Sequence, residues 1–348
     1  MMAAKYLVIA QELEHQLRLG LAEGRKLPTE AALCRQYGCS RQTVRSALEI
    51  LKEKGLILRR QGSGSYPIQS ALGTSRQIAL VVADKEEYLC PALLQGVRKA
   101  AAEAGLSVTC LETGGSRGEE AVLLEKLLRQ RPSGIILEPI TDLFGCFHPE
   151  LLFQLRSAGI PLVWVNGRYD TSSPAVLRDE AAAAGSLMSH LTGTGNARVA
   201  AILKSDDSRG PERFRQLSRC AGELGIRLSE ENILWYSQQE RLQLLEGDDS
   251  LLRRFQSSCR RDCSAVICFS DEIAYRLQKY LLSIHAAMGI VSYDNSYLAV
   301  SQVAALTSLG FDGCNPGSAA VKLLLDQLAG HPAADVLLPS RLYIRKSG

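Results

Sequence analysis

The chain has 348 residues, of which 46% are hydrophobic and 22% are charged. These values are ordinary for a globular protein, and the length suits one small domain followed by a larger one. No apolar run approaches the roughly 20 residues of a membrane span, and residues 1–17 become amphipathic too early for a signal peptide. We therefore expect a cytoplasmic protein that does not contact a membrane.

The ten cysteines and five histidines are scattered along the chain. The nearest pair of cysteines, Cys259 and Cys263, lies one helical turn apart, and no second pair or histidine cluster completes a metal site. The sequence therefore predicts free thiols, no metal and no cofactor.

The net charge of +3 is divided unevenly along the chain. Residues 1–66 hold eleven Lys and Arg against six Glu, a charge of +5, whereas residues 67–348 hold 29 basic and 31 acidic side chains, a charge of −2. A small basic segment at one end is typical of a nucleic-acid reader.

Three helices are expected in the basic segment. The first runs from about residue 5 to residue 19, with Leu13 and Leu17 on its apolar face. The second begins after Thr29, a good capping residue, and ends at Gly38. The third follows the capping residue Ser40 and spans about residues 41–54. Its apolar positions are Val44, Ala47, Leu48 and Leu51.

A basic hairpin follows these helices. Residues 56–58 are expected to form a strand, Arg59, Arg60 and Gln61 come next, and residues 62–65 form a Gly-Ser turn. Two helices with a tight turn and then a hairpin predict a winged helix-turn-helix over residues 1–66, and residues 67–76 are expected to be a linker.

The first turn of the third helix is polar and basic, as a recognition helix in the major groove requires. Arginine can bind guanine or phosphate, and glutamine can pair with adenine. An ordinary solvated helix face is the alternative for each residue taken alone. The residues concerned are Arg41, Gln42, Thr43 and Arg45.

The stretch LPTEAALCRQYGCSRQTVRSALEILKEKGLILRRQGSGSY resembles the GntR-family winged helix almost throughout. It departs at Ala31, where many members carry Arg or Asn, and at Cys39, where valine is usual. The resemblance implies DNA-contacting or positioning roles for Glu30, Ser40, Arg41, Thr43, Arg45, Gln61 and Gly62.

From residue 77 onward the pattern changes to alternating strands and helices. Most of the strands are continuous apolar runs, which predicts a parallel sheet with helices on both faces. We expect an α/β domain over 77–348 with two lobes and a cleft at the carboxyl ends of the strands. The expected strands are 78–84, 106–112, 134–139, 160–166, 198–204, 232–237, 265–270 and 290–294, and a late helix is expected at about 315–329.

Polar residues follow many of these strands and form a set suited to a carbohydrate, since carboxylates, Asn and Arg bind hydroxyl groups and aromatic rings cover sugar faces. Each residue alone could instead cap a helix, as Ser270 and Asp271 could, and Trp164 could equally pack in the core. The polar set comprises Asp84, Tyr88, Glu138, Asn166, Arg168, Asp206, Asp207, Arg213, Ser270, Asp271 and Asp294.

The segments RPSGIILEP, GIPLVWVN, LKSDDSRGPERF, AVICFSDEIA and IVSYDNS resemble the LacI/GalR-type effector domain, which is itself similar to periplasmic sugar-binding proteins. Ser270 and Ser292 stand where Asn and Gly are usual. The resemblance implies an N-terminal winged helix-turn-helix (α+β) plus a C-terminal α/β two-lobed periplasmic-binding-protein-like domain. It also implies that Arg213 and Asp294 bind sugar hydroxyls.

A GntR-type head joined to this body, ending in LLPSRLYIRKS, is similar to arabinose-responsive repressors. The resemblance implies a homodimer on double-stranded operator DNA, released by a small sugar, with L-arabinose or a related pentose first. The expected effector-binding residues are Tyr88, Glu138, Asn166, Arg213, Asp271 and Asp294.

Two alternatives remain open at this point. The effector could be a non-sugar ligand such as a nucleobase. The body could also be a pyridoxal-dependent enzyme, although Lys204, the lysine that ends a central strand, has no supporting motif. No other nucleophile or phosphate-binding motif occurs, so a non-enzymatic regulator is the expected class.

Overall fold

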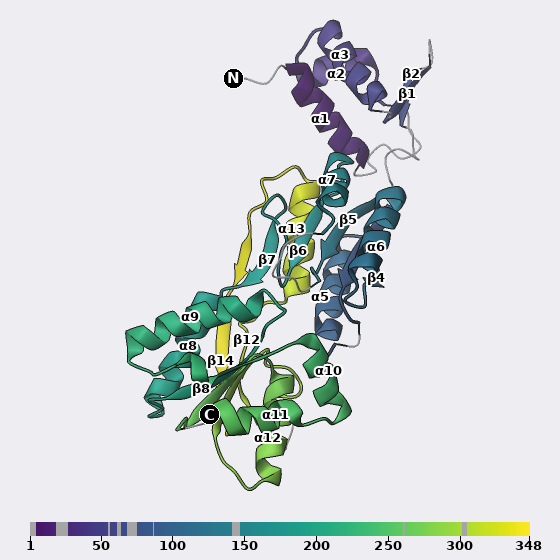
Figure 1. Ribbon diagram of the computed structural model, residues 1–348. Helices are drawn as coiled ribbons and strands as arrows, with labels where there is room; N and C mark the ends of the chain where they lie inside the picture. The colour runs from purple at the N-terminus through teal and green to yellow at the C-terminus, as the bar shows by residue number, and fades with distance from the viewer. Residues whose placement is uncertain are drawn as a thin grey trace.

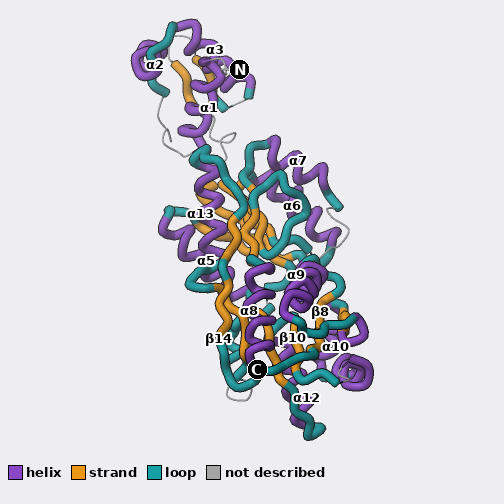
Figure 2. The backbone as a smooth tube through the Cα atoms, turned by 90° about the vertical axis from the view of Figure 1, so that its left-hand side faces the viewer, coloured by secondary structure: helices purple, strands orange, loops and turns teal. Residues whose placement is uncertain are grey.

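The computed structural model describes residues 5–18, 27–54, 56–60, 64–67, 75–85, 87–140, 147–259, 262–300 and 305–348. Figure 1 shows the amino-terminal winged helix at one end of the molecule and two α/β lobes beyond it. Figure 2 shows the sheets of both lobes as stacked strands covered by helices. No helix among the described residues is long and apolar enough to cross a membrane.

The winged helix is built as its sequence predicts. Ser40 accepts a hydrogen bond from the backbone N–H of Thr43 at 3.2 Å, and Thr29 accepts one from Ala32 at 3.2 Å, so both predicted caps form. The apolar stripe of the third helix is fully buried against the first two helices. The elements are α1 (Lys5–Arg18), α2 (Glu30–Tyr37), α3 (Arg41–Glu53) and the antiparallel pair β1 (Ile57–Arg60) and β2 (Gly64–Pro67).

The first lobe has a parallel six-stranded sheet in the order β13-β7-β6-β5-β3-β4. Both faces are covered by helices, because the central strands are apolar on both sides. The strands are β3 (Ser75–Val82), β4 (Ser107–Glu112), β5 (Pro132–Leu137), β6 (Leu162–Val165), β7 (Ala175–Arg178) and β13 (Val336–Leu338). The helices are α5 (Cys90–Glu103), α6 (Arg117–Gln130), α7 (Pro149–Ser157) and α13 (Pro316–Leu328).

The second lobe has a six-stranded sheet in the order β14-β12-β11-β10-β8-β9, in which β14 runs antiparallel to β12 and the other neighbours are parallel. Its strands are β8 (Val199–Lys204), β9 (Ile233–Tyr236), β10 (Ala265–Cys268), β11 (Gly289–Tyr293), β12 (Thr307–Phe311) and β14 (Ser340–Tyr343). Its helices are α8 (Glu180–Gly193), α9 (Arg209–Leu224), α10 (Gln238–Glu246), α11 (Ser250–Arg254) and α12 (Asp271–Ser283), with short turns at Glu230–Asn232 and Phe255–Cys259.

The chain passes between the lobes at three points, which lie after β7, after β12 and after β13. The three segments are hydrogen-bonded to one another: the N–H of Asp179 donates to Leu338 O at 3.1 Å, and that of Asp312 donates to Pro339 O at 3.1 Å. Three short adjacent segments that connect two lobes are the usual form of a hinge in two-lobed proteins.

Two glycines allow the helices beside this hinge to approach closely. A Cβ on Gly96 of α5 would lie 1.8 Å from Oδ1 of Asn315, and one on Gly317 of α13 would lie 2.3 Å from Leu93 O. Asn315 caps α13 and donates from Nδ2 to Ala92 O at 3.0 Å. These contacts fix the start of α13 against α5.

All eight strands predicted for the α/β domain are present, and the late helix is found as α13. The prediction did not resolve β7, β12, β13 and β14 as separate strands, because each is short or lies in the irregular final segment. The linker was expected at 67–76; β2 extends to Pro67 and β3 begins at Ser75, and residues 68–74 are outside the described ranges.

Candidate functional site: the DNA-reading head and the interlobe cleft

The amino-terminal turn of α3 presents the predicted DNA-reading side chains to solvent. Arg41, Gln42 and Arg45 are exposed, and Thr43 is half-buried with its hydroxyl 2.8 Å from Ser40 Oγ. Ser40 thus has a positioning role, since it caps the helix that carries the readers. Gln61 and Gly62, predicted for the wing, are outside the described residues.

Glu30 links the recognition helix to the wing. Its Oε2 accepts from Nε of Arg45 at 3.0 Å, and its Oε1 accepts from Nη2 of Arg59 at 2.7 Å. A carboxylate held by two arginines is poorly placed to read a base, but it fixes the directions of both guanidinium groups. The sequence resemblance singled out Glu30 and the hairpin placed Arg59 in the wing, but only the fold joins them.

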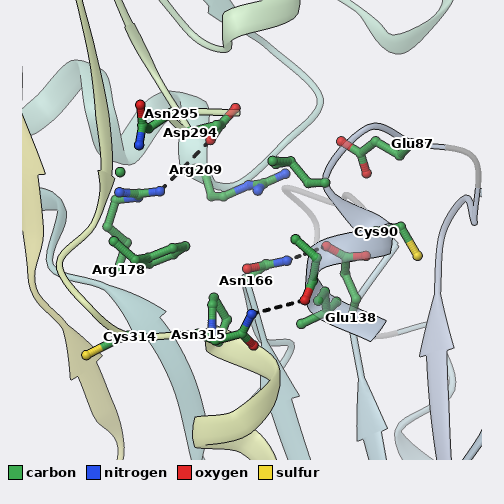
Figure 3. A pocket seen from close by; sticks show the side chains of 16 residues that line it. Glu87, Cys90, Glu138, Asn166, Arg178, Arg209, Asp294, Asn295, Cys314 and Asn315 are labelled. Carbon is green, nitrogen blue, oxygen red and sulfur yellow. Dashed lines mark hydrogen bonds and ion pairs between the residues drawn. The ribbon is translucent and has the colours of Figure 1, made fainter. Parts of the chain in front are cut away.

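The cleft between the lobes contains a cavity of about 230 Å³. Figure 3 shows its polar side chains converging from both lobes. Glu138 follows β5 and Asn166 follows β6, so both lie at the carboxyl edge of the first sheet, and Nδ2 of Asn166 donates to Glu138 Oε1 at 2.7 Å. Its wall includes Glu87, Cys90, Glu138, Asn166, Arg178, Arg209, Asp294, Asn295, Phe311 and Asn315.

Asp294 brings the two lobes together in this cavity. It follows β11 of the second lobe and accepts a hydrogen bond from the hydroxyl of Tyr88, which precedes α5 of the first lobe. Its other carboxylate oxygen lies 3.9 Å from Nη2 of Arg178, at the end of β7. The predicted residues Tyr88 and Asp294 are therefore in direct contact.

Arg178 is a cleft residue that the sequence analysis missed. Its guanidinium lies 4.0 Å from the ring centre of Phe311 and donates to Ser340 Oγ at 2.9 Å. Burial lowers the pKa of Arg178, and the neighbouring Arg213 acts in the same direction. The strand β7 that positions it was not predicted, so its place at a strand end could not be inferred.

Arg213 lies in α9 as expected, and it is only 2% exposed. Its Nε donates to Glu180 at 3.2 Å, its Nη1 donates to Phe269 O at 2.6 Å, and its guanidinium stacks 3.8 Å from the Tyr293 ring centre. Arg213 lines the part of the cleft next to α8, where Arg178 and Asp294 also lie.

Asp271 occupies a different environment from the other predicted effector residues. It is fully buried and accepts hydrogen bonds from Ser292 Oγ, Ser308 Oγ and the N–H of Ser296, each at 2.6 Å. Burial, with the nearby charge of Asp294, raises the pKa of Asp271 to about 6. It lines none of the described parts of the cleft. Its contacts hold together the strand ends of the second lobe, including the segment before Asp294.

The surroundings of Ser270 and Trp164 decide between the two roles that the sequence left open for each residue. Ser270 accepts a hydrogen bond from the N–H of Ile273 at 3.4 Å. It therefore caps α12, which was the alternative to a ligand-binding role. Trp164 is fully buried in the apolar layer beneath the sheet, with Tyr169 edge-on at 5.4 Å. Trp164 therefore packs in the core and does not stack on a ligand.

The charged groups around the start of α9, in the part of the cleft next to the cavity, form ion pairs with one another. Arg209 forms a double contact with Asp207, with Nε at 3.0 Å from Oδ1 and Nη2 at 2.6 Å from Oδ2. Lys204 is buried, and Nζ lies 4.0 Å from Asp206. The desolvation of Glu87, together with the charge of Glu138, raises the pKa of Glu87 to about 7.

Comparisons with known proteins match both parts of the chain. Residues 5–66 match the bacterial regulatory proteins, gntR family, and residues 188–348 match the periplasmic binding protein-like domain. The arabinose metabolism transcriptional repressor of Halalkalibacterium halodurans is 28% identical over 93% of this chain and 89% of its own length. The protein of the same description from Geobacillus stearothermophilus is 27% identical over 99% of this chain and 97% of its own.

Solved structures match the fold. A complex described as transcriptional regulator CelR with cellobiose covers 96% of this chain and 99% of its own, with a TM-score of 0.68 and 20% identity. A regulator from Alkaliphilus metalliredigens complexed with D-xylulofuranose covers 78% of this chain and 99% of its own, with a TM-score of 0.66 and 16% identity.

The winged helix, the two-lobed body and the relatives together define the class: the chain is a transcriptional repressor and not an enzyme. Residues 5–66 match the gntR family of regulatory proteins and residues 188–348 match a periplasmic binding protein-like domain, and the two relatives that match over nearly the whole chain are described as repressors of arabinose metabolism.

Proposed function

We propose that the chain binds operator DNA in the cytoplasm as a homodimer and that a neutral monosaccharide, L-arabinose first, releases it. Two winged helices related by a two-fold axis would suit palindromic half-sites. The exposed, basic first turn of α3, with Arg41, Gln42 and Arg45, supports the DNA contact.

The composition of the cavity wall is the observation that supports a sugar as the ligand. The cavity of about 230 Å³ shares Glu138, Asn166 and Arg209 with a neighbouring cavity of about 590 Å³, so the cleft has room for a monosaccharide or for a somewhat larger sugar, and the polar groups of its wall carry the choice of ligand class. Acceptors and donors from both lobes surround this space, as vicinal hydroxyls require. Within this class, arabinose is favoured because the two relatives that match over nearly the whole chain are repressors of arabinose metabolism.

The charge of the wall favours a neutral ligand over a sugar phosphate. Arg209 is engaged by Asp207, and Arg178 lies near Asp294, while Glu138 adds negative charge. A phosphate would meet carboxylates with no unpaired cation in the described wall to compensate them. We infer that Glu138, Asn166, Arg178 and Asp294 bind the hydroxyl groups, and that Arg213 supports them from behind.

The ligand would act by changing the balance between lobe arrangements. A ligand shifts an equilibrium only by its difference in affinity for the two states. Because the cavity is lined from both lobes, a sugar that bridges them favours one arrangement, and the hinge passes that change toward the head. The repressor would then lose operator affinity, by the linkage of the two binding sites.

Thermal unfolding of the full-length protein across a panel of free sugars, sugar phosphates and nucleobases tests this proposal. A ligand that binds only the folded state raises the melting temperature. We expect a rise with a free pentose and a matching loss of operator binding in a gel-shift titration. A rise with a nucleobase or a sugar phosphate, and none with a free sugar, would overturn the ligand class.

A further inference from the structure

Asn295 lines the effector cavity beside Asp294, and the proposed function gives it no role. Its side-chain oxygen accepts a hydrogen bond from Nη2 of Arg345 at 2.6 Å. A guanidinium group has only donors, so the amide must direct its oxygen toward Arg345 and its nitrogen elsewhere. Figure 3 shows this nitrogen on the side of the amide that faces Arg178. Nδ2 donates to no residue that the structure describes, so this donor is available to a ligand.

Arg345 is itself held in place. It follows β14, in the ending LLPSRLYIRKS of the chain. Its N–H donates to Thr307 Oγ1 at 2.9 Å, and its Nη1 donates to Leu306 O at 2.7 Å. These contacts with the start of β12 fix the guanidinium before any ligand arrives. Arg345 lines none of the described parts of the cleft, so it can act on a ligand only through Asn295.

The backbone of the turn that carries Asn295 is fixed as well. Asp294 and Asn295 have φ values of 103° and 47°, a left-handed conformation that persists only where the surrounding structure imposes it. The N–H of Asp294 donates to Leu309 O at 2.7 Å, and that of Asn295 donates to Ser308 Oγ at 2.9 Å. Gly310 leaves room for the amide, since a Cβ there would lie 2.7 Å from Cβ of Asn295. The turn and the guanidinium together set the direction of the amide.

We propose that Asn295 binds the effector by donating from Nδ2 to an oxygen of the sugar, and that Arg345 is the positioning residue that keeps this donor directed into the cavity. The inference rests on the proposed function and adds a donor to its ligand-binding groups. The ionised carboxylate of Asp294 only accepts, so two adjacent residues offer an acceptor and a donor side by side. This pair selects a ligand that carries an accepting oxygen next to a hydroxyl group.

Asn295→Asp in the full-length protein separates this role from a structural one. The carboxylate has nearly the same shape as the amide, tolerates the left-handed backbone and keeps an oxygen for Arg345, so the midpoint of unfolding in urea should be kept. It has no donor to offer the sugar. We expect the affinity for L-arabinose, measured by isothermal titration calorimetry, to weaken about tenfold, the equivalent of one hydrogen bond of about 1.4 kcal/mol.

Asn295→Gly removes the donor without adding a charge beside Asp294. Glycine adopts a positive φ without strain, so the turn can keep its backbone. The affinity for L-arabinose should again weaken about tenfold. Unchanged affinity in both Asn295 variants would overturn the ligand-binding role.

Arg345→Met tests the positioning role. The variant should weaken L-arabinose binding about as much as Asn295→Gly, and it should add little in the Asn295→Gly background, because no amide remains to be oriented. Arg345→Lys keeps a donor and should recover part of the affinity. Lys346→Met, at the exposed neighbouring position, is the control and should bind L-arabinose as the original chain does.

The remaining outcomes separate the positioning role from the proposed function. Losses that add up in the double variant of Arg345→Met and Asn295→Gly would overturn the positioning role, since they would show that Arg345 supports the cleft by another route. If the original protein binds neither L-arabinose nor another free sugar, the proposed function fails and this inference fails with it. Sugar binding by the original protein, with no change in the Asn295 variants, would overturn this inference alone.

Discussion

The hydroxyl of Tyr88 donates a hydrogen bond to the carboxylate of Asp294 across the cleft, joining the first lobe to the second. Burial, together with the negative charge of Asp294, holds the pKa of Tyr88 well above its ordinary value, so the phenol keeps its proton and remains a donor. A ligand hydroxyl that binds Asp294 must either share this carboxylate with Tyr88 or displace it. The contact therefore couples ligand binding to the arrangement of the lobes.

Replacing Tyr88 by Phe should remove this donor and leave the ring in place. A hydrogen bond to a charged group contributes about 1.5–3 kcal/mol, so we expect the free energy of unfolding in urea to fall by about that amount. Tyr297→Phe is a matched control, because Tyr297 is 66% exposed. Equal stability of Tyr88→Phe and the control would contradict an interlobe role for the hydroxyl.

Arg41 and Arg45 should carry operator readout. Replacement of either by Ala should weaken operator binding by about 1–3 kcal/mol if a bidentate base contact is lost, as measured by fluorescence anisotropy with a labelled operator. Lys52→Ala provides the control, since Lys52 lies in the last turn of the same helix. Unchanged affinity in both arginine variants would show that α3 docks differently. Loss of affinity for all sequences alike would assign the contact to phosphate.

Glu30→Gln should show whether Glu30 acts by orienting Arg45 and Arg59 or only through its own negative charge. The variant keeps the size of the side chain but weakens its contacts with Arg45 and Arg59. Because one negative charge is lost, binding to nonspecific DNA should stay equal or become tighter. Operator binding should weaken, since the two guanidinium groups lose their fixed directions. A rise in operator affinity parallel to the nonspecific rise would show that Glu30 acts only through its charge.

The order of strands and helices was predictable because the buried strands are long apolar runs and the helices carry clear caps. Ser40, Thr29 and the apolar stripe at Val44 and Leu51 are local signals, and all form as expected. The predicted residues Glu138, Asn166 and Asp294 line one cavity. Parallel strands bring Glu138 and Asn166 to the carboxyl edge of the first sheet, and Asp294 lies at the carboxyl end of β11 in the second sheet.

The remaining cleft residues depend on contacts between distant segments. Arg178 follows a strand of four residues, too short for a pattern, and meets Phe311 and Ser340 only after the chain has crossed between lobes. Asp271 follows a strand, as the residues predicted to bind the effector do, yet hydroxyl groups of two other strands enclose it. Position at a strand end identifies the edge of the sheet, but the direction of each side chain is set by packing.

Arg213 and Glu180 should behave as a buried ion pair that supports the cleft. Removing one partner of such a pair typically costs about 3–5 kcal/mol, because the other charge is left uncompensated. We expect Arg213→Ala to lose stability on this scale and to lose the sugar response. The double variant with Glu180→Ala should recover part of the stability, as chemical unfolding would measure. Additive losses in the double variant would show that the two side chains are not coupled.

The pKa of Glu87 predicts a specific pH dependence of stability. Burial first, and then the charge of Glu138, raise this pKa to about 7, while Arg209, Arg241 and Lys204 act in the opposite direction. A carboxyl whose pKa is raised in the folded state binds more protons there than in the unfolded chain. Between the ordinary pKa of about 4.3 for Glu and about 7, stability should therefore fall as pH rises, and level off above that range.

Glu87→Gln should remove this part of the pH dependence, because the amide does not titrate. Melting temperatures of both proteins between pH 4.5 and 8, in buffers of equal ionic strength, would measure it, with Glu103→Gln on the exposed face of α5 as the control. The variant should gain stability relative to the original chain as pH rises toward 7. Parallel curves for the two proteins would mean that Glu87 stays ionised in the folded cleft, and that a sugar there would face a charged acceptor and not a carboxylic acid donor.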